Sequence, residues 1–417
     1  MISRRNMIAR GAAALASGAA LLKSIGAPVA GASATRPATS PASFTPVITP
    51  NGSTLAWHWD GDVKVFELVA EPVKRQFASG MSVDCWGYNG QTPGPTIEAV
   101  EGDKVRLIVT NHLPEPTSVH WHGLIIPNGE DGVGGLTQPH IQPGETYIYE
   151  FTIRQHGTQM YHPHTDDMVQ MALGMMGFFI IHPKEPPPPQ SRVDRDFCIF
   201  LQEWFVEPGT SRPNPMVMTD FNLFTFNSRV YPGTEPLVVR QGQRVRIRYA
   251  NLSMDSHPIH LHGHRFMMTG TDAGDVPESA RWPENTINVP VGTARAIEFV
   301  ADNPGDWPVH CHKNHHAMNA MSHDVPNLIG ADLSKANRQI ERLLPQYMAM
   351  GQQGMHDMTQ MQMPLPKNTL PMMAGEGPYG SIGMGGMFTL LKVRERITSF
   401  EDPGWYQQPP GTSARKQ

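Results

Sequence analysis

Residues 308–321 read PVHCHKNHHAMNAM, and they hold one cysteine, four histidines and two methionines. Side chains along a β-strand alternate between its two faces, so a strand here would point His310 and His312 to one side and Cys311 to the other. A histidine and a methionine follow this cysteine by five and ten positions. Thiolate, imidazole and a weak thioether are the ligands of a blue-copper electron-transfer site. The stretch therefore predicts two metal sites, one on each face of a single strand.

A second stretch, residues 257–263, reads HPIHLHG and supplies further imidazoles. His260 and His262 would share one face of a strand, and His257 lies three residues upstream of this pair. A blue-copper site needs a second imidazole beside the one that follows Cys311. We therefore expect His257 to join Cys311.

Four histidine motifs occur in order along the chain. They are HxHG at His120–Gly123, HxH at His162–His164, HPxHLHG at His257–Gly263 and HCHxxxHxxxxM at His310–Met321. In type and order these motifs resemble those of the multicopper oxidases. The alternative, scattered core or surface histidines, does not account for four ordered motifs with a cysteine in the last one.

The resemblance implies four copper ions in each functional unit and assigns a role to each motif residue. The type 1 copper would be bound by His257, Cys311, His316 and Met321, and the type 2 copper by His120 and His260. The two type 3 coppers would be bound by His122, His162, His164, His262, His310 and His312.

The same resemblance implies the reaction. An electron that arrives at Cys311 would pass to His310 or His312, its sequence neighbours, and four such electrons would reduce O2 to water. Asp131 stands nine residues after His122, where an acid helps protonation in related oxidases; the alternative is an exposed loop carboxylate. Some relatives carry an acid directly after the histidine that follows the cysteine by five positions. Here that histidine is His316, and the residue after it is Ala317.

Composition and internal duplication predict the fold. Thirty-nine glycines and 39 prolines in 417 residues favour many short strands and turns, an all-β class. The segment from Gly102 to Gly123 recurs 140 positions later at Gly242 to Gly263, and residues 157–164 recur 148 positions later at residues 305–312. We expect two tandem cupredoxin-like Greek-key β-sandwiches at residues 44–183 and 191–330. In this register Thr117, Pro163, Met168 and Leu173 stand where the second copy has its type 1 ligands, so the first copy should lack that site.

The remaining segments are a linker between the two copies and an extension after the second copy. Residues 184–190, KEPPPPQ, read as a stiff extended linker. Residues 331–417 form a Met-rich C-terminal extension, in which we expect a short helix over residues 333–344 after Asp332 and a strand over residues 388–393. Its methionines either bind Cu(I) or fill irregular packing, and the sequence leaves both open.

The first 34 residues read as a twin-arginine-type export signal, with Arg4 and Arg5, an apolar run and the small-residue site Ala32–Ala34. Alternatives are an ordinary secretory signal or a membrane anchor, although the run is short for a stable span. This signal predicts a periplasmic or secreted location for the protein. The formal net charge of −5 does not favour nucleic acid as a partner.

The sequence suggests partners, a donor and an oligomeric state, and it leaves competing functions open. O2 and a one-electron donor are the expected partners. Cu(I), with a role in copper tolerance, is favoured over Mn(II), Fe(II) and phenols, and two-domain relatives imply a homotrimer. The competing functions are a copper nitrite reductase, which would need a cysteine where Pro163 stands, and a non-catalytic copper-storage protein. Cys85 and Cys198 could pair, while His315 and His323 match no ligand position.

Overall fold

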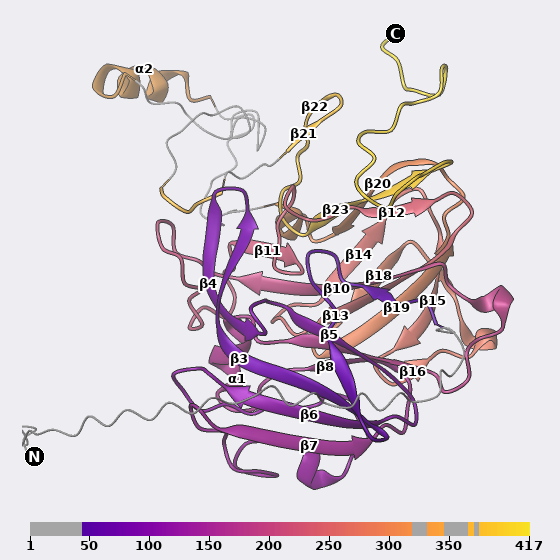
Figure 1. Cartoon of the computed structure of the whole chain (residues 1–417). Coiled ribbons are helices and arrows are strands. Elements are labelled where there is room, and N and C mark those ends of the chain that lie inside the picture. Colours follow the sequence, from indigo (N-terminus) through magenta and orange to yellow (C-terminus); the bar gives the residue numbers. More distant parts are fainter. Residues whose placement is uncertain (1–43, 319–331, 346–365, 371–374) are drawn as a thin grey trace, which may run out of the picture. The chain divides into compact units, whose positions relative to one another are not determined.

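The structure, a computed structural model, describes residues 44–318, 332–345, 366–370 and 375–417 (Figure 1). The expected signal at residues 1–34, together with Met321 and His323, lies outside these residues. Among the described residues most regular structure is β-strand, as the sequence predicts, and no helix has both the length and the apolar character needed to cross a bilayer.

The first half of the chain forms a sandwich of two sheets. The larger sheet has the order β2-β3-β6-β7, with β4 paired to β3, and the smaller has the order β5-β9-β8. The strands are β2 (Trp57–Asp60), β3 (Val63–Ala78), β4 (Met81–Tyr88), β5 (Gly94–Val100), β6 (Lys104–Asn111), β7 (Thr146–Thr152), β8 (Gly157–Tyr161) and β9 (Gly177–His182). Burial alternates along β6, so one of its faces packs into the core, as its alternating sequence predicts.

The second half forms a larger sandwich. Its first sheet has the order β1-β10-β13-β19-β15-β16, with β11 and β17 at the side, and its second has the order β12-β23-β20-β14-β18. The first sheet contains β1 (Val47–Ile48), β10 (Arg195–Trp204), β11 (Leu223–Phe226), β13 (Arg244–Asn251), β15 (Phe266–Thr271), β16 (Gly274–Asp275), β17 (Pro283–Glu284) and β19 (Thr293–Val300). The second contains β12 (Leu237–Arg240), β14 (His257–Leu261), β18 (Thr286–Val289), β20 (Gly305–Cys311) and β23 (Phe388–Arg394).

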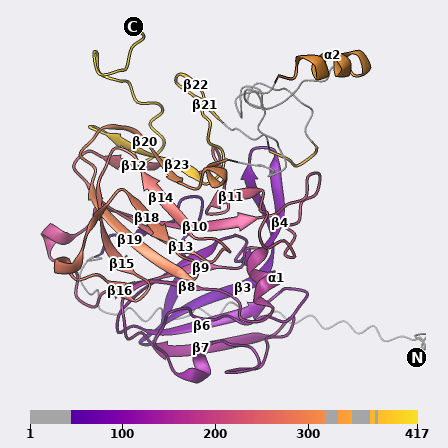
Figure 2. The ribbon, with the colours of Figure 1, turned by 180° about the vertical axis from the view of Figure 1, so that it is seen from behind.

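The two sandwiches repeat one strand topology. In the first, β5 runs parallel to β9, which runs antiparallel to β8. In the second, β12 runs parallel to β23, which runs antiparallel to β20 (Figure 1; seen from behind in Figure 2). Strand β23 is therefore the counterpart of β9.

This pairing changes the expected end of the second sandwich. The offset between the copies is 148 positions at β8 and β20, but it is 212 at β9 and β23, where Ile181 corresponds to Val393. The Met-rich segment is thus an insertion before the last strand of the second sandwich, and the boundary expected at residue 330 does not end that unit. The expected strand at residues 388–393 is confirmed, but it is a central strand of the sandwich.

Helices and short turns complete the described chain. Helix α2 (Ser334–Leu343) lies where the sequence predicts it, and the backbone N–H of Ser334 donates to Asp332 Oδ1 at 3.0 Å. The other elements are helix α1 (Asp167–Ala172), the 3-10 turns η1 (Asn128–Glu130), η2 (Pro189–Ser191), η3 (Glu278–Ala280) and η4 (Asn314–Ala317), and the hairpin β21 (Glu376–Gly377) with β22 (Gly380–Ser381). The expected stiff linker therefore ends in the turn η2.

A buried ion pair contributes to the contact between the two sandwiches. Asp196 on β10 accepts two hydrogen bonds from the Arg248 guanidinium on β13, at 2.8 and 2.9 Å. The same guanidinium donates to Thr158 Oγ1 of the first sandwich at 2.7 Å. Cys198 lies in this interface core, whereas Cys85 lies in another core cluster, and both thiols are free.

Candidate metal centres

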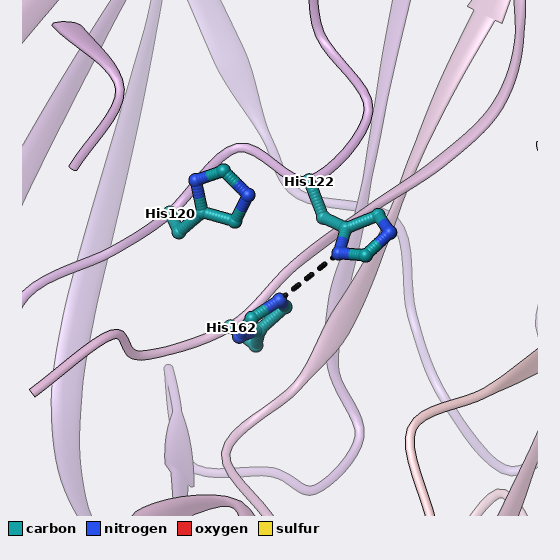
Figure 3. A group of neighbouring side chains, drawn as sticks. All are labelled: His120, His122 and His162. Carbon is teal, nitrogen blue, oxygen red and sulfur yellow. Dashed lines mark hydrogen bonds between the residues drawn. The ribbon is translucent and has the colours of Figure 1, made fainter. Parts of the chain in front are cut away.

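Four histidines of the first sandwich converge. His120 and His162 lie opposite each other in an isolated antiparallel bridge, and their ring centroids are 5.4 Å apart. The rings of His122 and His164 lie 5.8 and 5.6 Å from that of His120. His122 Nδ1 and His162 Nε2 face each other at 3.2 Å (Figure 3). We call these four residues the first quartet.

Four histidines of the second sandwich converge in the same way on β14 and β20. The ring of His260 lies 4.6 Å from that of His262 and 5.6 Å from those of His310 and His312. His262 Nε2 and His310 Nε2 are 3.1 Å apart. This second quartet reproduces the first because β14 pairs with β20 directly opposite His260 and His310.

Backbone carbonyls fix the ring orientation of two histidines in each quartet. The Nδ1 atoms lie at 2.7 to 2.9 Å from these oxygens, in the pairs His120 with Asp131, His162 with Pro163, His260 with Asn285 and His310 with Cys311. A carbonyl oxygen only accepts, so each Nδ1 carries the proton and each Nε2 keeps its lone pair. Such partners of the outer ring nitrogen are the usual support for a metal-binding histidine.

Burial keeps His162 and His262 in the metal-binding form. It lowers the pKa of His162 to about 3 and, together with the charge of His260, that of His262 to about 4. A neutral imidazole is the form that ligates copper. His162 and His262 can therefore accept a cation at neutral pH without first releasing a proton.

A third centre lies on the opposite face of β20. Cys311 Sγ is 3.7 Å from His257 Nδ1 and 3.7 Å from His316 Nδ1, and the two nitrogens are 3.1 Å apart. All three residues are buried. Burial raises the pKa of the Cys311 thiol to about 12, so a bound cation is needed to remove its proton. This set of one thiolate and two imidazoles fits copper.

Along β20 the geometry places Cys311 beside His257 and His316, and His310 beside His262, while the binding of copper by these residues stays a prediction. His316 comes from η4, where the ring of Phe224 stacks on it at 4.1 Å between centroids. The expected fourth ligand, Met321, lies outside the described residues.

Glu203, on β10, lies behind this centre, and sequence reasoning missed it. Its Oε1 atom is 3.7 Å from His257 Nε2 and 3.8 Å from His316 Nε2, and it has no hydrogen-bond partner in the described structure. Its Oε2 atom accepts from the backbone N–H groups of Met254 and Asp255. Burial, assisted by the charge of Asp255, raises the pKa of Glu203 to about 7. The available signal was a carboxyl group shortly after the apolar run at residues 197–201.

Asp131 lies beside the first quartet, as the sequence suggests. Its carboxyl Oδ1 is 3.5 Å from His120 Nδ1, whereas its backbone oxygen is at 2.7 Å and forms the hydrogen bond. The side chain is 32 % exposed, so it can exchange protons with water.

The two quartets are alike in burial except at one pair of positions. His162 and its counterpart His310 are both 7 % exposed, whereas His164 is half-buried and its counterpart His312 is exposed. Ring contacts occur within each quartet, and among the described residues none joins a histidine of one quartet to a histidine of the other. His315 lies outside both quartets, in the wall of a surface cavity with Asp255 and Lys313.

Comparisons with known proteins agree with this arrangement. Two family profiles, both described as multicopper oxidase, match residues 70–186 and 207–330. A probable nitrite reductase-hydroxylamine oxidoreductase fusion protein of Kuenenia stuttgartiensis is 29% identical over 63% of this chain and 31% of its own length. Copper resistance protein A of Escherichia coli is 43% identical over 28% of this chain and 18% of its own length. The chain thus spans less than a third of the length of these two relatives.

Solved structures share the fold over more of the chain. A blue copper oxidase from Nitrosomonas europaea superimposes with a TM-score of 0.59 at 25% identity, covering 79% of this chain and 85% of that one. The multicopper oxidase mgLAC gives 0.58 at 26% identity, covering 80% and 87%. Both family profiles match the chain, and the structure assembles both quartets and the thiolate centre. The chain therefore belongs to the multicopper oxidase family.

Proposed function

We propose that this protein is an exported oxidase that couples one-electron oxidation of a donor to the four-electron reduction of O2 to water. The observation that carries the proposal is the position of Cys311. Its side chain enters the buried thiolate centre, while the adjacent His310 enters the second quartet. One strand therefore joins a centre suited to accepting electrons to a centre suited to reducing O2.

Copper, when bound, supplies the one-electron redox chemistry of both centres, as type 1, type 2 and type 3 ions. The chain's own part is to hold the ligands and connect them. The hydrogen bond from His310 Nδ1 to the Cys311 carbonyl, at 2.9 Å, gives the two residues a second connection beside the backbone. This path is short and rigid because β20 is held between β14 and β23.

Protons are the other requirement, since each O2 takes up four protons with its four electrons. Asp131 is suited to deliver them at the type 2 position because it lies beside His120 and keeps contact with solvent. A carboxyl group so placed can pass one proton at a time from water to the site.

We further propose that the oxygen-reducing cluster forms between subunits of a homotrimer. Each chain assembles two separate quartets, and the exposed His312 leaves the second quartet open to a partner. A ring of three chains would place the first quartet of one subunit against the second quartet of the next, which is a heterologous contact that closes.

Cu(I) is the donor that we favour, with a role in copper tolerance. Twenty-five methionines and the similarity to a protein named copper resistance protein A support it. Mn(II), Fe(II) and phenols are competing donors. The motifs at residues 1–34 support export by the twin-arginine route to the periplasm or the outside of the cell.

An oxygen electrode tests the reaction. Copper-loaded protein should consume one O2 for every four Cu(I) ions oxidised, with no hydrogen peroxide released. A copper-storage protein would consume no O2. A nitrite reductase would instead consume nitrite under anaerobic conditions, and that result would overturn the proposal.

A further inference from the structure

A cavity of about 470 Å³ lies at the junction of the two sandwiches. Residues of β8 and β9 form its wall together with residues of β13, β16, β19 and η3 and of the linker around η2. Five arginines and four carboxylates line it: Arg192, Arg244, Arg246, Arg248 and Arg281, with Asp196, Asp275, Glu278 and Glu298. With the lining His156 and His182 counted as neutral, the wall has one positive charge in excess, whereas the whole chain has a formal charge of −5. We call this the arginine cavity.

Three of these arginines come from one face of β13. Arg244, Arg246 and Arg248 alternate with apolar residues that are buried in the core of the second sandwich, so the three side chains point the same way. In the first copy, 140 positions earlier, Ile108 stands where the second copy has Arg248. The third guanidinium is thus particular to the second sandwich.

Two buried carboxylates pair with these three guanidiniums. Glu298 accepts from Arg244 Nε and from Arg246 Nε, both at 2.9 Å, and Asp196 accepts from Arg248 Nε at 2.8 Å. Burial alone would raise the pKa of Glu298, but the charges of Arg246 and Arg244 lower it, and the pKa of Asp196 is lowered in the same way. Both acids are therefore ionised at neutral pH and neutralise two of the three charges. An unneutralised charge on a half-buried side chain costs free energy.

Two further arginines hold their guanidiniums at the wall and keep their charge. Arg281 Nε donates to the backbone carbonyl of Val276 at 3.0 Å. Arg192 Nε donates in the same way to Pro187, also at 3.0 Å. A carbonyl oxygen has no net charge, so these hydrogen bonds orient the two guanidiniums without neutralising them. The planar fork of a guanidinium fits the oxygens of a carboxylate or a phosphate.

We propose that the arginine cavity binds a small oxyanion with two or more negatively charged oxygens, either inorganic phosphate or a small polycarboxylate. Such an anion would supply the negative charge that the wall lacks and would accept charge-assisted hydrogen bonds from more than one guanidinium. The cavity has the size of an ordinary small-ligand site. Because its wall combines both sandwiches and the linker, the bound anion would hold these three parts together. The inference does not depend on the proposed oxidase function.

Isothermal titration calorimetry on the full, copper-loaded chain tests the binding, with inorganic phosphate in one titration and tricarballylate in another. Sodium chloride keeps the ionic strength constant, so that general screening does not change. The wild type should bind one anion per chain. Arg192→Gln/Arg281→Gln should raise the Kd about tenfold or more, because it removes charge-assisted hydrogen bonds to the anion.

The matched control is Arg265→Gln/Arg396→Gln, which removes the same charge at two exposed positions outside the cavity. It should leave the Kd nearly unchanged. An equal loss of affinity in both double variants, or no saturable binding of either anion to the wild type, would overturn the proposal. A lower Kd for phosphate assigns a phosphate-type ligand and a lower Kd for tricarballylate assigns a polycarboxylate, and either result supports the site.

Glu278→Gln is a second variant with the opposite expected sign. The exposed Glu278 carboxylate lines the same wall and repels an anion, so its removal should lower the Kd for phosphate. Circular dichroism identifies an arginine variant that fails to fold. In that case Glu278→Gln decides, and unchanged or weaker binding would overturn the proposal. The titrations need no donor and no turnover, so their result is separate from the test of O2 reduction.

Discussion

At the residue scale, Cys311 belongs to the thiolate centre and is joined by peptide bonds to His310 and His312 of the second quartet. Cys311→Ser should abolish the intense visible absorption of a copper–thiolate bond and stop donor oxidation, because serine is a poor copper ligand at neutral pH. The eight quartet imidazoles remain, so up to three of the four coppers should be retained. Absorption spectra and copper analysis check this.

Cys85→Ser provides the matched control, because Cys85 is also a buried free thiol but lies in a separate core cluster. It should keep the absorption and the full copper content. Blue absorption that survives Cys311→Ser would contradict the assignment of the thiolate centre.

Asp196 offers a second test at this scale, on stability. Burial alone would raise its pKa, but the charges of Arg248 and Arg246 lower it below the usual value. A carboxyl with a lowered folded-state pKa stabilises the protein above its unfolded pKa near 4, and this contribution is lost as pH falls through the folded-state pKa. Asp196→Asn leaves Arg248 unpaired and buried, so it should cost about 3–5 kcal/mol at pH 7.

Urea unfolding of the copper-free protein at several pH values measures this effect. The difference between wild type and Asp196→Asn should shrink as the pH is lowered below 4. Asp62→Asn removes an exposed pair with Lys104 and should leave the stability nearly unchanged. If both substitutions lowered the free energy of unfolding equally, the buried Asp196–Arg248 pair would stabilise the contact between the sandwiches no more than an exposed pair does.

The residues of the metal centres were largely predictable, because alternation along a strand places His310 and Cys311 on opposite faces and the duplicated motifs repeat this. Glu203 was not predictable in the same way. Its approach to His257 and His316 depends on how β10 packs behind β14 and η4, and a single sequence does not contain that long-range contact.

At the scale of elements, strand β23 decides where the second sandwich ends. It pairs with β12 on one side and β20 on the other, so it completes the sheet that carries Cys311. Truncation after Met387 should therefore prevent folding of the second sandwich and abolish blue absorption. Truncation after Tyr406 removes only exposed residues and should be tolerated, which solubility and absorption measurements check.

The sequence predicted β23 as a strand but not its place in the sandwich. The duplication is visible up to His312 because the offset between the copies changes only from 140 to 148 positions, and the insertion then raises it to 212 before β23. The apolar pattern of residues 388–393 shows a strand, but it does not show which strands lie beside it.

The insertion can be tested apart from the strand that follows it. Leu370 is buried in a core cluster shared by both sandwiches, and Asn368 accepts a hydrogen bond from the backbone of Ser82, so residues 366–370 should be kept. Replacement of residues 346–365 by a Gly/Ser linker of equal length removes six methionines but none of these contacts. If the donor binds outside the insertion, this variant should retain Cu(I) oxidation in an oxygen-electrode assay. Loss of Cu(I) oxidation with phenol oxidation intact would instead assign the donor site to the insertion.

At the scale of the whole molecule, the two quartets are equivalent products of one duplication that must meet to hold three coppers. Among the described residues no ring contact joins them, and the proposed trimer would bring them together between subunits. A trimer with a first quartet and a second quartet at each interface would have three complete clusters. This arrangement predicts complementation between two variants that are inactive alone.

His162→Ala disables the first quartet, and His262→Ala disables the second, so each variant should lack oxidase activity. When the two chains are produced together, a random trimer places an intact first quartet against an intact second quartet at about a quarter of its interfaces. Activity should therefore return to about that fraction of the wild-type value, as measured by O2 consumption. The control pairs His162→Ala with His122→Ala, which damage the same quartet and should restore nothing. No recovery in the first mixture, together with a monomer in gel filtration that still binds four coppers, would mean that one chain closes the cluster by itself.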